Sequence, residues 1–156
     1  MSRGIDARLR VKVEARRGTI TMKRKEWSIK TGGRGFTDLT DRVSAFVRES
    51  GVHDGMCNLF LVHTSASLII NENADPSVRR DLETFFARLI PDGDPSYEHD
   101  TEGPDDMPSH IRTVLTQNSL TIPVVTGELG LGTWQAVYLW EHRKIPHDRR
   151  VIATVW

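Results

Sequence analysis

Short runs of branched and aromatic residues, interrupted at close intervals by glycine or proline, limit the fold of this 156-residue chain more than any other feature. Branched and aromatic side chains pack well on a pleated surface, so such runs are typical of β-strands. They occupy residues 19–31, 57–63, 68–70, 119–126, 134–141 and 151–156. Several strands at this spacing, joined by hairpins, predict a mainly antiparallel sheet or sandwich.

Some of these strands carry information about their place in the sheet. Residues 57–63 are apolar at nearly every position, which predicts a central strand buried on both faces. Pro123 has no backbone N–H, so we expect segment 119–126 to lie at an edge or to contain a bulge. Trp134 opens an alternating strand, where we expect a core aromatic side chain; stacking on a bound ring is its functional alternative.

Three segments have the periodicity of amphipathic helices instead. The first follows Asp38 and ends at Gly51; the second has Asp75 as its cap and Pro76 in its first position. The third and shortest begins at Asp105. Apolar residues line one face of the first two helices at Leu39, Val43, Phe46, Val47, Val78, Leu82, Phe85 and Leu89. The chain is therefore expected to be α+β, with a few helices covering the sheet.

Composition predicts one ordinary globular domain, since 38% of the residues are apolar and 27% are charged. There is no uncharged apolar run of membrane-spanning length and no apolar signal region near the first residue, so we expect no membrane contact. Cys57 is the single cysteine and lies in an apolar run. We expect it to be a small buried side chain in a protein of the reducing cytoplasm.

The charges are distributed unevenly, although the net charge is zero. The first 35 residues hold 11 of the 21 Lys and Arg but 3 of the 21 Asp and Glu. Residues 1–18 predict a basic, mobile arm that precedes a single domain at 19–156. The basic residues of segment 19–31 are interleaved with apolar ones, which favours a solvated strand face over a nucleic-acid footprint.

Segment 97–110 has the composition that most favours chemistry. It contains two histidines and five carboxylates around the turn at Gly103 and Pro104. Carboxylate oxygens and neutral imidazoles bind divalent cations and transfer protons near neutral pH; a solvated acidic loop is the alternative. His99 and His110 do not have the spacing of a zinc finger or of a metalloprotease helix, so spacing alone supports a metal only weakly.

Further polar clusters fall at the ends of predicted elements, where binding groups usually lie. His63 ends a buried strand, where a structural histidine is the alternative to a functional one. Capping explains Asp75, whereas nothing in turn chemistry explains Glu72. The glycine-rich turn 127–132 is either a plain hairpin or a set of N–H groups that face an anion. Residues 141–143 end a strand. They either lie at the surface or contribute a positively charged side chain to the site.

Four motifs, taken together, resemble the YjbQ-type family, also called the secondary thiamine-phosphate synthase family. They are HTSASLIINEN at 63–73 with Asp75-Pro76, YEHD at 97–100 with Glu102-Gly103, DDMPSHI at 105–111, and LGTWQ at 131–135. Their order and spacing match the family from about residue 18 to the end. The resemblance implies a barrel-like β-sandwich, assembly as a homotrimer, and thiamine-phosphate synthesis as a secondary activity.

The resemblance also implies functional positions, to which we assign roles as hypotheses. The catalytic groups would be His63, Glu72 and Asp75. A divalent ion such as zinc, manganese or magnesium would be held by His99, His110, Glu102 and Asp106. Contacts to substrate or phosphate would come from Ser67, Asn71, Gly130, Gly132, Thr133 and Gln135. The family pattern leaves open whether Asp105 or Asp106 is the functional residue of the pair.

Three functions fit this set of residues. The first couples a pyrimidine methyl diphosphate to a thiazole phosphate and expels pyrophosphate, which asks for a cation and for donors to phosphate. The second is metal-assisted hydrolysis of a phosphorylated metabolite by the same groups. The third is a trimeric protein that binds a small molecule without turnover. A site between two subunits is open in each case.

Overall fold

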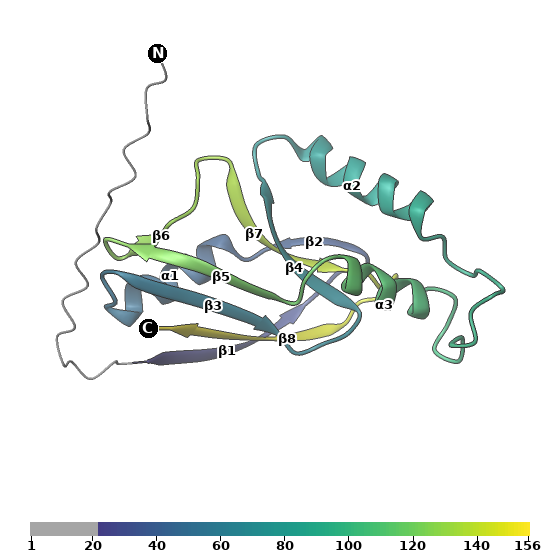
Figure 1. The fold of residues 1–156 in the computed structure, drawn as a ribbon, viewed down its shortest axis with the longest axis horizontal. Coiled ribbons are helices and arrows are strands. Elements are labelled where there is room, and N and C mark those ends of the chain that lie inside the picture. The colour runs from purple at the N-terminus through teal and green to yellow at the C-terminus, as the bar shows by residue number, and fades with distance from the viewer. Residues whose placement is uncertain (1–21) are drawn as a thin grey trace, which may run out of the picture.

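The computed structural model describes residues 22–156 and contains two antiparallel sheets (Figure 1). The five-stranded sheet has the order β1-β8-β3-β5-β6 and the three-stranded sheet the order β2-β7-β4. The strands are β1 Lys23–Lys30, β2 Gly35–Asp38, β3 Gly55–Leu61, β4 Ala66–Glu72, β5 Ser119–Val125, β6 Glu128–Leu129, β7 Gln135–Glu141 and β8 Asp148–Val155. The predicted α+β fold with antiparallel sheets is confirmed; the predicted arm 1–18 lies outside the described residues.

One hydrophobic core fills the space between the two sheets and α1 (Thr40–Ser50). Strand β3 contributes its alternate residues, among which Cys57 and Leu59 are completely buried. Phe60, on the other face of β3, is 41% exposed. The prediction of a strand buried on both faces is therefore wrong for β3, because no helix covers the outer face of the larger sheet in the described part of the chain. The strand buried on both faces is β7.

Helix α1 agrees with its predicted bounds and face. The backbone N–H of Thr40 donates to the Asp38 carboxylate at 2.8 Å, and Val43 and Phe46 point into the core. Gly51 ends the helix in a left-handed conformation with φ of 73°, which a glycine adopts without a steric cost. The register with β3 shows no bulge at Pro123, and β5 lies between β3 and the two-residue edge strand β6 rather than at the edge itself. The Pro123 carbonyl accepts the Gly130 N–H just beyond β6.

Helix α2 (Pro76–Leu89) is capped by Asp75 as expected, but it faces the body with a different side. Its Arg79 donates to the Tyr138 hydroxyl at 2.8 Å, and its Glu83 accepts the indole N–H of Trp140. The aromatic residues on the outer face of β7 thus present polar edges, which select a polar stripe of the helix. Phe86 also packs against the Trp140 ring, with the ring centroids 4.8 Å apart. Of the predicted apolar stripe, Phe85 and Leu89 are exposed, whereas Val78 and Leu82 are half-buried. Figure 1 shows α2 on a flank of the molecule.

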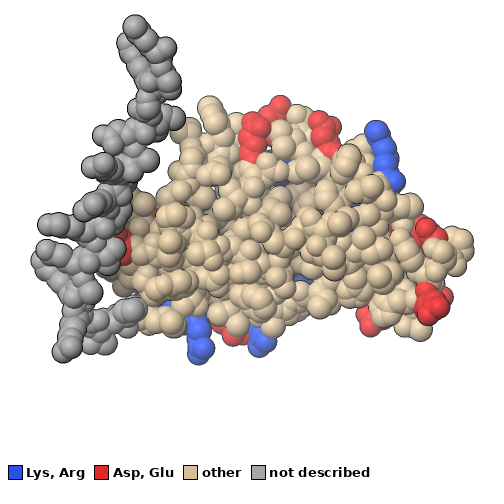
Figure 2. Space-filling view, viewed as in Figure 1, with Lys and Arg blue, Asp and Glu red and all other residues tan. Residues whose placement is uncertain are grey.

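A long loop leads from α2 to α3 (Asp106–Leu115), whose start at an Asp pair agrees with the prediction. Acidic side chains gather at this end of the molecule (Figure 2); Glu98, Asp100 and Glu102 are exposed there. No described helix has both the length and the apolar character needed to cross a membrane.

The end of β7 is buried rather than exposed. Glu141 and His142 are inaccessible to solvent, and Arg143 is nearly so. Two hydrogen bonds of 2.6 and 2.7 Å join the Glu141 carboxylate to the guanidinium of Arg149 in β8. The Thr31 hydroxyl donates to the same carboxylate at 3.0 Å. The surface alternative for residues 141–143 is therefore wrong, and this strand end forms an ionic network inside the protein.

His142 predicts an acid-sensitive fold. Burial, followed by the positive charge of Arg112, lowers the pKa of His142 from 6.5 to about 3. Between pH 6.5 and pH 3, His142 is therefore protonated in the unfolded chain but neutral in the folded chain. The free energy of unfolding decreases as the pH is lowered through this range. We expect His142 to lower the free energy of unfolding by about 2 kcal/mol between pH 7 and pH 5, because one pKa unit corresponds to about 1.4 kcal/mol.

Urea denaturation at pH 7, 6 and 5 measures this loss, with His142→Gln as the comparison. The variant is expected to be less stable at pH 7, because the histidine shares a 2.7 Å hydrogen bond with Ser67. Its stability should nevertheless change less with pH than that of the wild type. Equal pH dependence of the two proteins would contradict the assignment.

Candidate metal centre

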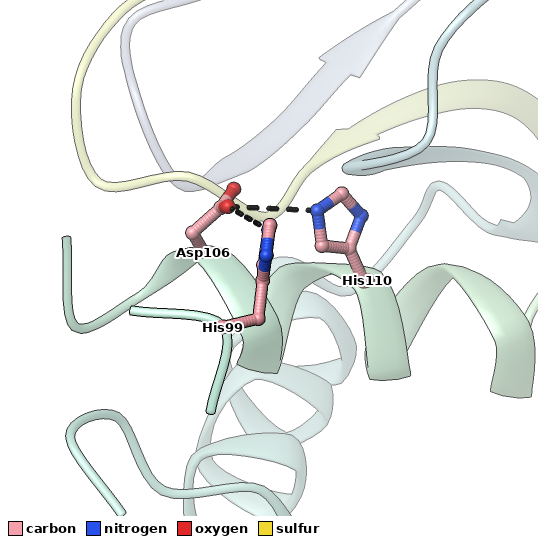
Figure 3. A group of neighbouring side chains, drawn as sticks. All are labelled: His99, Asp106 and His110. Atoms are coloured by element: carbon pink, nitrogen blue, oxygen red, sulfur yellow. Dashed lines mark ion pairs between the residues drawn. The ribbon is translucent and has the colours of Figure 1, made fainter. Parts of the chain in front are cut away.

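Three side chains converge beside the start of α3: His99, Asp106 and His110 (Figure 3). One potential ligand atom from each lies within 4.8 Å of the other two. The Asp106 Oδ2 atom is 2.8 Å from Nε2 of His99 and 3.6 Å from Nε2 of His110. Asp106 and His110 are four residues apart and share one helical face, whereas His99 comes from the loop before the helix.

The Asp106 carboxylate divides its two oxygens between different partners. Its Oδ1 accepts a hydrogen bond from Nη1 of Arg143 at 2.5 Å. Its Oδ2 is buried and points toward the two imidazoles; Nε2 of His99 lies 2.8 Å away but is not aligned for a hydrogen bond, and no other group in the described part of the chain bonds to this oxygen. A buried polar oxygen without a partner requires an explanation, and a cation bound between this oxygen and the two ring nitrogens supplies one.

The ring of His110 is oriented by the turn after β3. Its Nδ1 lies 2.8 Å from the backbone carbonyl oxygen of Thr64. A carbonyl accepts and cannot donate, so Nδ1 carries a proton, and in the neutral imidazole Nε2 is the nitrogen with the lone pair that a metal binds. Protein ligands of metals are usually held in this way, with the second ring nitrogen bonded to a carbonyl or carboxylate. Two imidazoles and one carboxylate fit a metal centre that keeps a position open for water or substrate.

Arg143 and Asp105 support this cluster from inside the protein. The Arg143 guanidinium donates to Asp105 at 3.2 Å, and the backbone N–H of Lys144 donates to the same carboxylate at 2.7 Å. Burial opposes the charge on Asp105, but these hydrogen bonds outweigh it and its pKa is lowered. Asp105 is thus occupied by structural contacts, whereas Asp106 keeps one oxygen for the histidines.

Glu102 stands apart from the other expected metal ligands. Its side chain is 70% exposed, and the nearest charged group is the Arg143 guanidinium at 3.7 Å. The backbone carbonyl of Glu102, rather than its carboxylate, accepts a hydrogen bond of 2.7 Å from that guanidinium. The loop therefore uses Glu102 to anchor its backbone, which leaves three convergent ligands out of the four expected.

His63 lies in the cavity next to this cluster. A cavity of about 470 Å³ is lined by residues that include His63, His110 and Asn118. The Nε2 atom of His63 accepts the backbone N–H of Arg150 at 2.7 Å. Burial and the nearby charge of Arg149 lower the pKa of His63, so its ring is neutral at neutral pH. The structure thus brings His63 toward the candidate metal centre.

The other two expected catalytic carboxylates lie elsewhere. Asp75 is exposed and accepts the backbone N–H of Ser77 at 2.7 Å, so it caps α2. Glu72 ends β4, while Thr64 lies just before the opposite end of that strand. A seven-residue strand spans about 20 Å at 3.3 Å per residue, so Glu72 and the His110 cluster belong to separate sites within one chain.

Glu72 belongs to a second cavity, of about 460 Å³, with Asn71, Trp134 and Gln135 in its lining. Trp134 precedes β7 and is 64% exposed, so the expectation of a core aromatic is wrong. Register explains the grouping, because Glu72 pairs with Gln135 across β4 and β7. Of the expected substrate contacts, this cavity therefore collects Asn71 and Gln135.

The remaining expected phosphate contacts are engaged inside the protein or exposed. Ser67 is completely buried, and its hydroxyl bonds to Thr116 and His142 at 2.5 and 2.7 Å. The Gly130 N–H donates to the Pro123 carbonyl at 2.7 Å, and the Gly132 N–H donates to the Gln135 side chain at 2.8 Å. These amides serve the hairpin rather than an anion. Thr133 is exposed beside them.

Two buried arginines, Arg143 and Arg149, lie near the site without having been predicted as site residues. Arg143 belongs to the segment 141–143, for which a cationic site residue was one of two interpretations. The residues next to it in the sequence did not indicate its partners, Asp105 and Asp106. Arg149 alternates with the apolar residues Val151 and Ala153, so strand periodicity places it on the inner face of β8. An arginine at an inward position is a signal, because buried arginines require partners.

Two antiparallel sheets with an imidazole–carboxylate cluster at the start of a short helix define an α+β protein with a candidate metal centre. The chain belongs to the YjbQ family: the model of this family, described as UPF0047 protein YjbQ-like, matches residues 25–156. The family recognised from the sequence motifs is thereby confirmed.

Relatives from two bacteria illustrate the match. The chain is 55% identical over 127 residues to the UPF0047 protein sll1880 of Synechocystis sp., covering 81% of this chain and 86% of that protein. It is 46% identical over 132 residues to the UPF0047 protein YjbQ of Escherichia coli O157:H7, covering 84% and 95%. A crystal structure of a YjbQ/UPF0047 family protein from Clostridium acetobutylicum superposes with a TM-score of 0.78 at 40% identity, covering 85% and 99%.

Proposed function

We propose that this protein is a metal-dependent enzyme that acts on a small phosphorylated metabolite, with a divalent ion held by His99, Asp106 and His110. The observation that carries the proposal is the buried Oδ2 of Asp106, which faces two imidazole nitrogens and makes no well-aligned hydrogen bond among residues 22–156. Two nitrogen ligands and one carboxylate suit zinc or manganese better than magnesium, which prefers oxygen ligands.

The bound ion would act as a Lewis acid on a phosphate or diphosphate oxygen. The protein's own residues prepare the site for that role. Arg143 fixes the orientation of the Asp106 carboxylate through a hydrogen bond to Oδ1. The Thr64 carbonyl holds His110 with a lone pair toward the ion. His63 uses Nε2 to accept a backbone N–H and therefore offers its Nδ1 proton to a substrate oxygen.

The family resemblance favours one reaction, in which a pyrimidine methyl diphosphate is coupled to a thiazole phosphate and pyrophosphate leaves. Hydrolysis of a phosphate ester is the second candidate. It is supported by the half-exposed ring of His99 and by the cavity beside His110, both of which admit water to the site. The two reactions differ in their products, namely thiamine phosphate with pyrophosphate in one case and free phosphate in the other.

The first prediction concerns metal content. We expect near-stoichiometric zinc or manganese in the purified wild-type protein and at least tenfold less in His99→Ala and His110→Ala, because each variant removes one of three ligands. Glu102→Gln is the matched control, since this exposed carboxylate lies in the same loop but outside the cluster. Elemental analysis of the four proteins decides the point.

Activity is measured on the same samples. The coupling assay and a phosphate-release assay on a panel of phosphorylated metabolites are expected to lose activity in both histidine variants and to keep it in Glu102→Gln. Metal retained in both histidine variants would contradict the proposed centre. Bound metal without turnover in either assay would instead support a binding protein.

We also propose that the chain assembles as a homotrimer, as its resemblance to the family implies. Two outward apolar side chains of α2 support this, because Phe85 and Leu89 are 58% and 55% exposed in the single chain. A threefold ring repeats one heterologous contact, which would cover these side chains in every copy. We expect sedimentation equilibrium to give three times the 17.7 kDa chain mass, and Phe85→Glu to lower it. A monomeric wild-type protein would refute the assembly.

A further inference from the structure

A third cavity, distinct from the one that contains Glu72, adjoins the candidate metal centre. It has a volume of about 480 Å³ and is lined in part by His63, Thr64, Asn118 and Arg149. The first three of these residues also line the cavity that contains His110. The two cavities are therefore neighbours that share a wall, with the candidate metal centre toward one end and Arg149 at the other.

Arg149 is buried and offers one donor to this cavity. Its Nε and Nη2 atoms donate to Glu141 at 2.7 and 2.6 Å, and Nη2 also donates to the Ser65 hydroxyl at 3.0 Å. Its Nη1 has no partner among the described residues, yet it is not one of the fully buried atoms left without a hydrogen bond. With Arg149 in the cavity lining, Nη1 is the donor available to a ligand.

The residues around Arg149 are also donors. His63 is neutral and carries its proton on Nδ1, because Nε2 accepts the Arg150 backbone N–H. The Asn118 side chain has no hydrogen bond within the described part of the chain and offers an amide N–H, and Thr64 offers a hydroxyl. All residues that line the two cavities belong to the described chain, and none of them is a carboxylate.

The electrostatic balance favours an anion in this place. Glu141 partly compensates Arg149, but the arginine affects His63 more strongly than the glutamate does, and its charge lowers the pKa of that histidine. Asp105 is turned toward Arg143, and Asp106 divides its two oxygens between Arg143 and the two imidazoles; neither residue lines the cavity. The charges around His63 therefore favour an anion over a cation.

The arrangement of donors points to phosphate rather than to a carboxylate. A carboxylate binds arginine best through two parallel hydrogen bonds to one edge of the guanidinium. Glu141 already occupies the Nε–Nη2 edge of Arg149, so a ligand meets Nη1 alone. A tetrahedral phosphate, with three terminal oxygens, suits single donors that come from different residues.

We propose that Arg149, His63 and Asn118 form a phosphate-binding subsite beside the metal centre. The substrate is then a phosphate or diphosphate ester that places a phosphate group against Arg149 and extends toward His110. This inference rests on the proposed function where it has the substrate reach the metal ion. The phosphate-binding subsite itself is argued only from the hydrogen-bond donors of Arg149, His63 and Asn118. Arg149 is thereby a proposed binding residue, although neither composition nor the sequence motifs had assigned it a role.

Calorimetric titration of the metal-free full-length protein with inorganic phosphate tests the subsite. Arg149→Lys keeps a positive charge beside Glu141 but loses Nη1, and Asn118→Asp places a negative charge in the cavity. We expect each change to weaken phosphate binding at least tenfold. Asn73→Asp is the matched control, because it adds the same charge to an exposed residue beyond the far end of β4 and should leave the affinity unchanged.

Each other outcome has a defined meaning. Phosphate affinity that is unchanged in both Arg149→Lys and Asn118→Asp, with both variants folded by circular dichroism, would overturn the subsite. Acetate that binds as tightly as phosphate would overturn the assignment to phosphate. Phosphate binding that appears only with added metal and disappears in His110→Ala would place phosphate on the ion, so the subsite would fail while the proposed function stood. Arg149-dependent phosphate binding in a protein that binds no metal would support the subsite and refute the proposed function.

Discussion

The buried guanidinium of Arg143 is the interaction on which the candidate site depends. It joins the end of β7 to the start of α3 by donating to Asp105, to Asp106 and to the backbone carbonyl of Glu102. Two adjacent carboxylates would otherwise lie buried side by side, and removing one partner of a buried ion pair typically costs about 3–5 kcal/mol. Because Arg143 uses only one oxygen of Asp106, the other remains directed at the two histidines. The same contact therefore supports the fold and prepares a ligand for a cation.

Strand register brings the remaining parts to this position. Ala66 pairs with Glu141 across β4 and β7, so the turn that contains Thr64 lies near the strand end that carries Arg143. That turn supplies the carbonyl that orients His110. Strand β8 brings Arg149 to the same place through its ion pair with Glu141. Residues from three distant parts of the sequence, 64–66, 99–110 and 141–149, thus meet at one end of the smaller sheet, whereas Glu72 lies at the other end of β4.

Sequence periodicity predicted most of the fold, because strands and helices each produce a characteristic local pattern of apolar residues. It succeeded for α1, where the apolar stripe that includes Val43 is the one that enters the core. It failed for α2, because the choice of its inward face depends on the polar edges of Tyr138 and Trp140, which come from a distant strand. Composition singled out segment 97–110, and the structure brings His99, Asp106 and His110 together. Asp105 makes structural contacts while Asp106 keeps one oxygen toward the histidines, and this difference depends on Arg143. No local sequence pattern identifies Arg143 as their partner.

Anomalous diffraction from crystals grown with zinc tests the central claim most directly, namely that Arg143 leaves one oxygen of Asp106 free for a cation. The account predicts one strong anomalous peak at about 2.0–2.2 Å from Oδ2 of Asp106 and from Nε2 of both His99 and His110, which are ordinary zinc–ligand distances. Oδ1 of Asp106 should remain bonded to Arg143. A peak at exposed carboxylates such as Glu102, or a crystal without any peak among these three side chains, would contradict it.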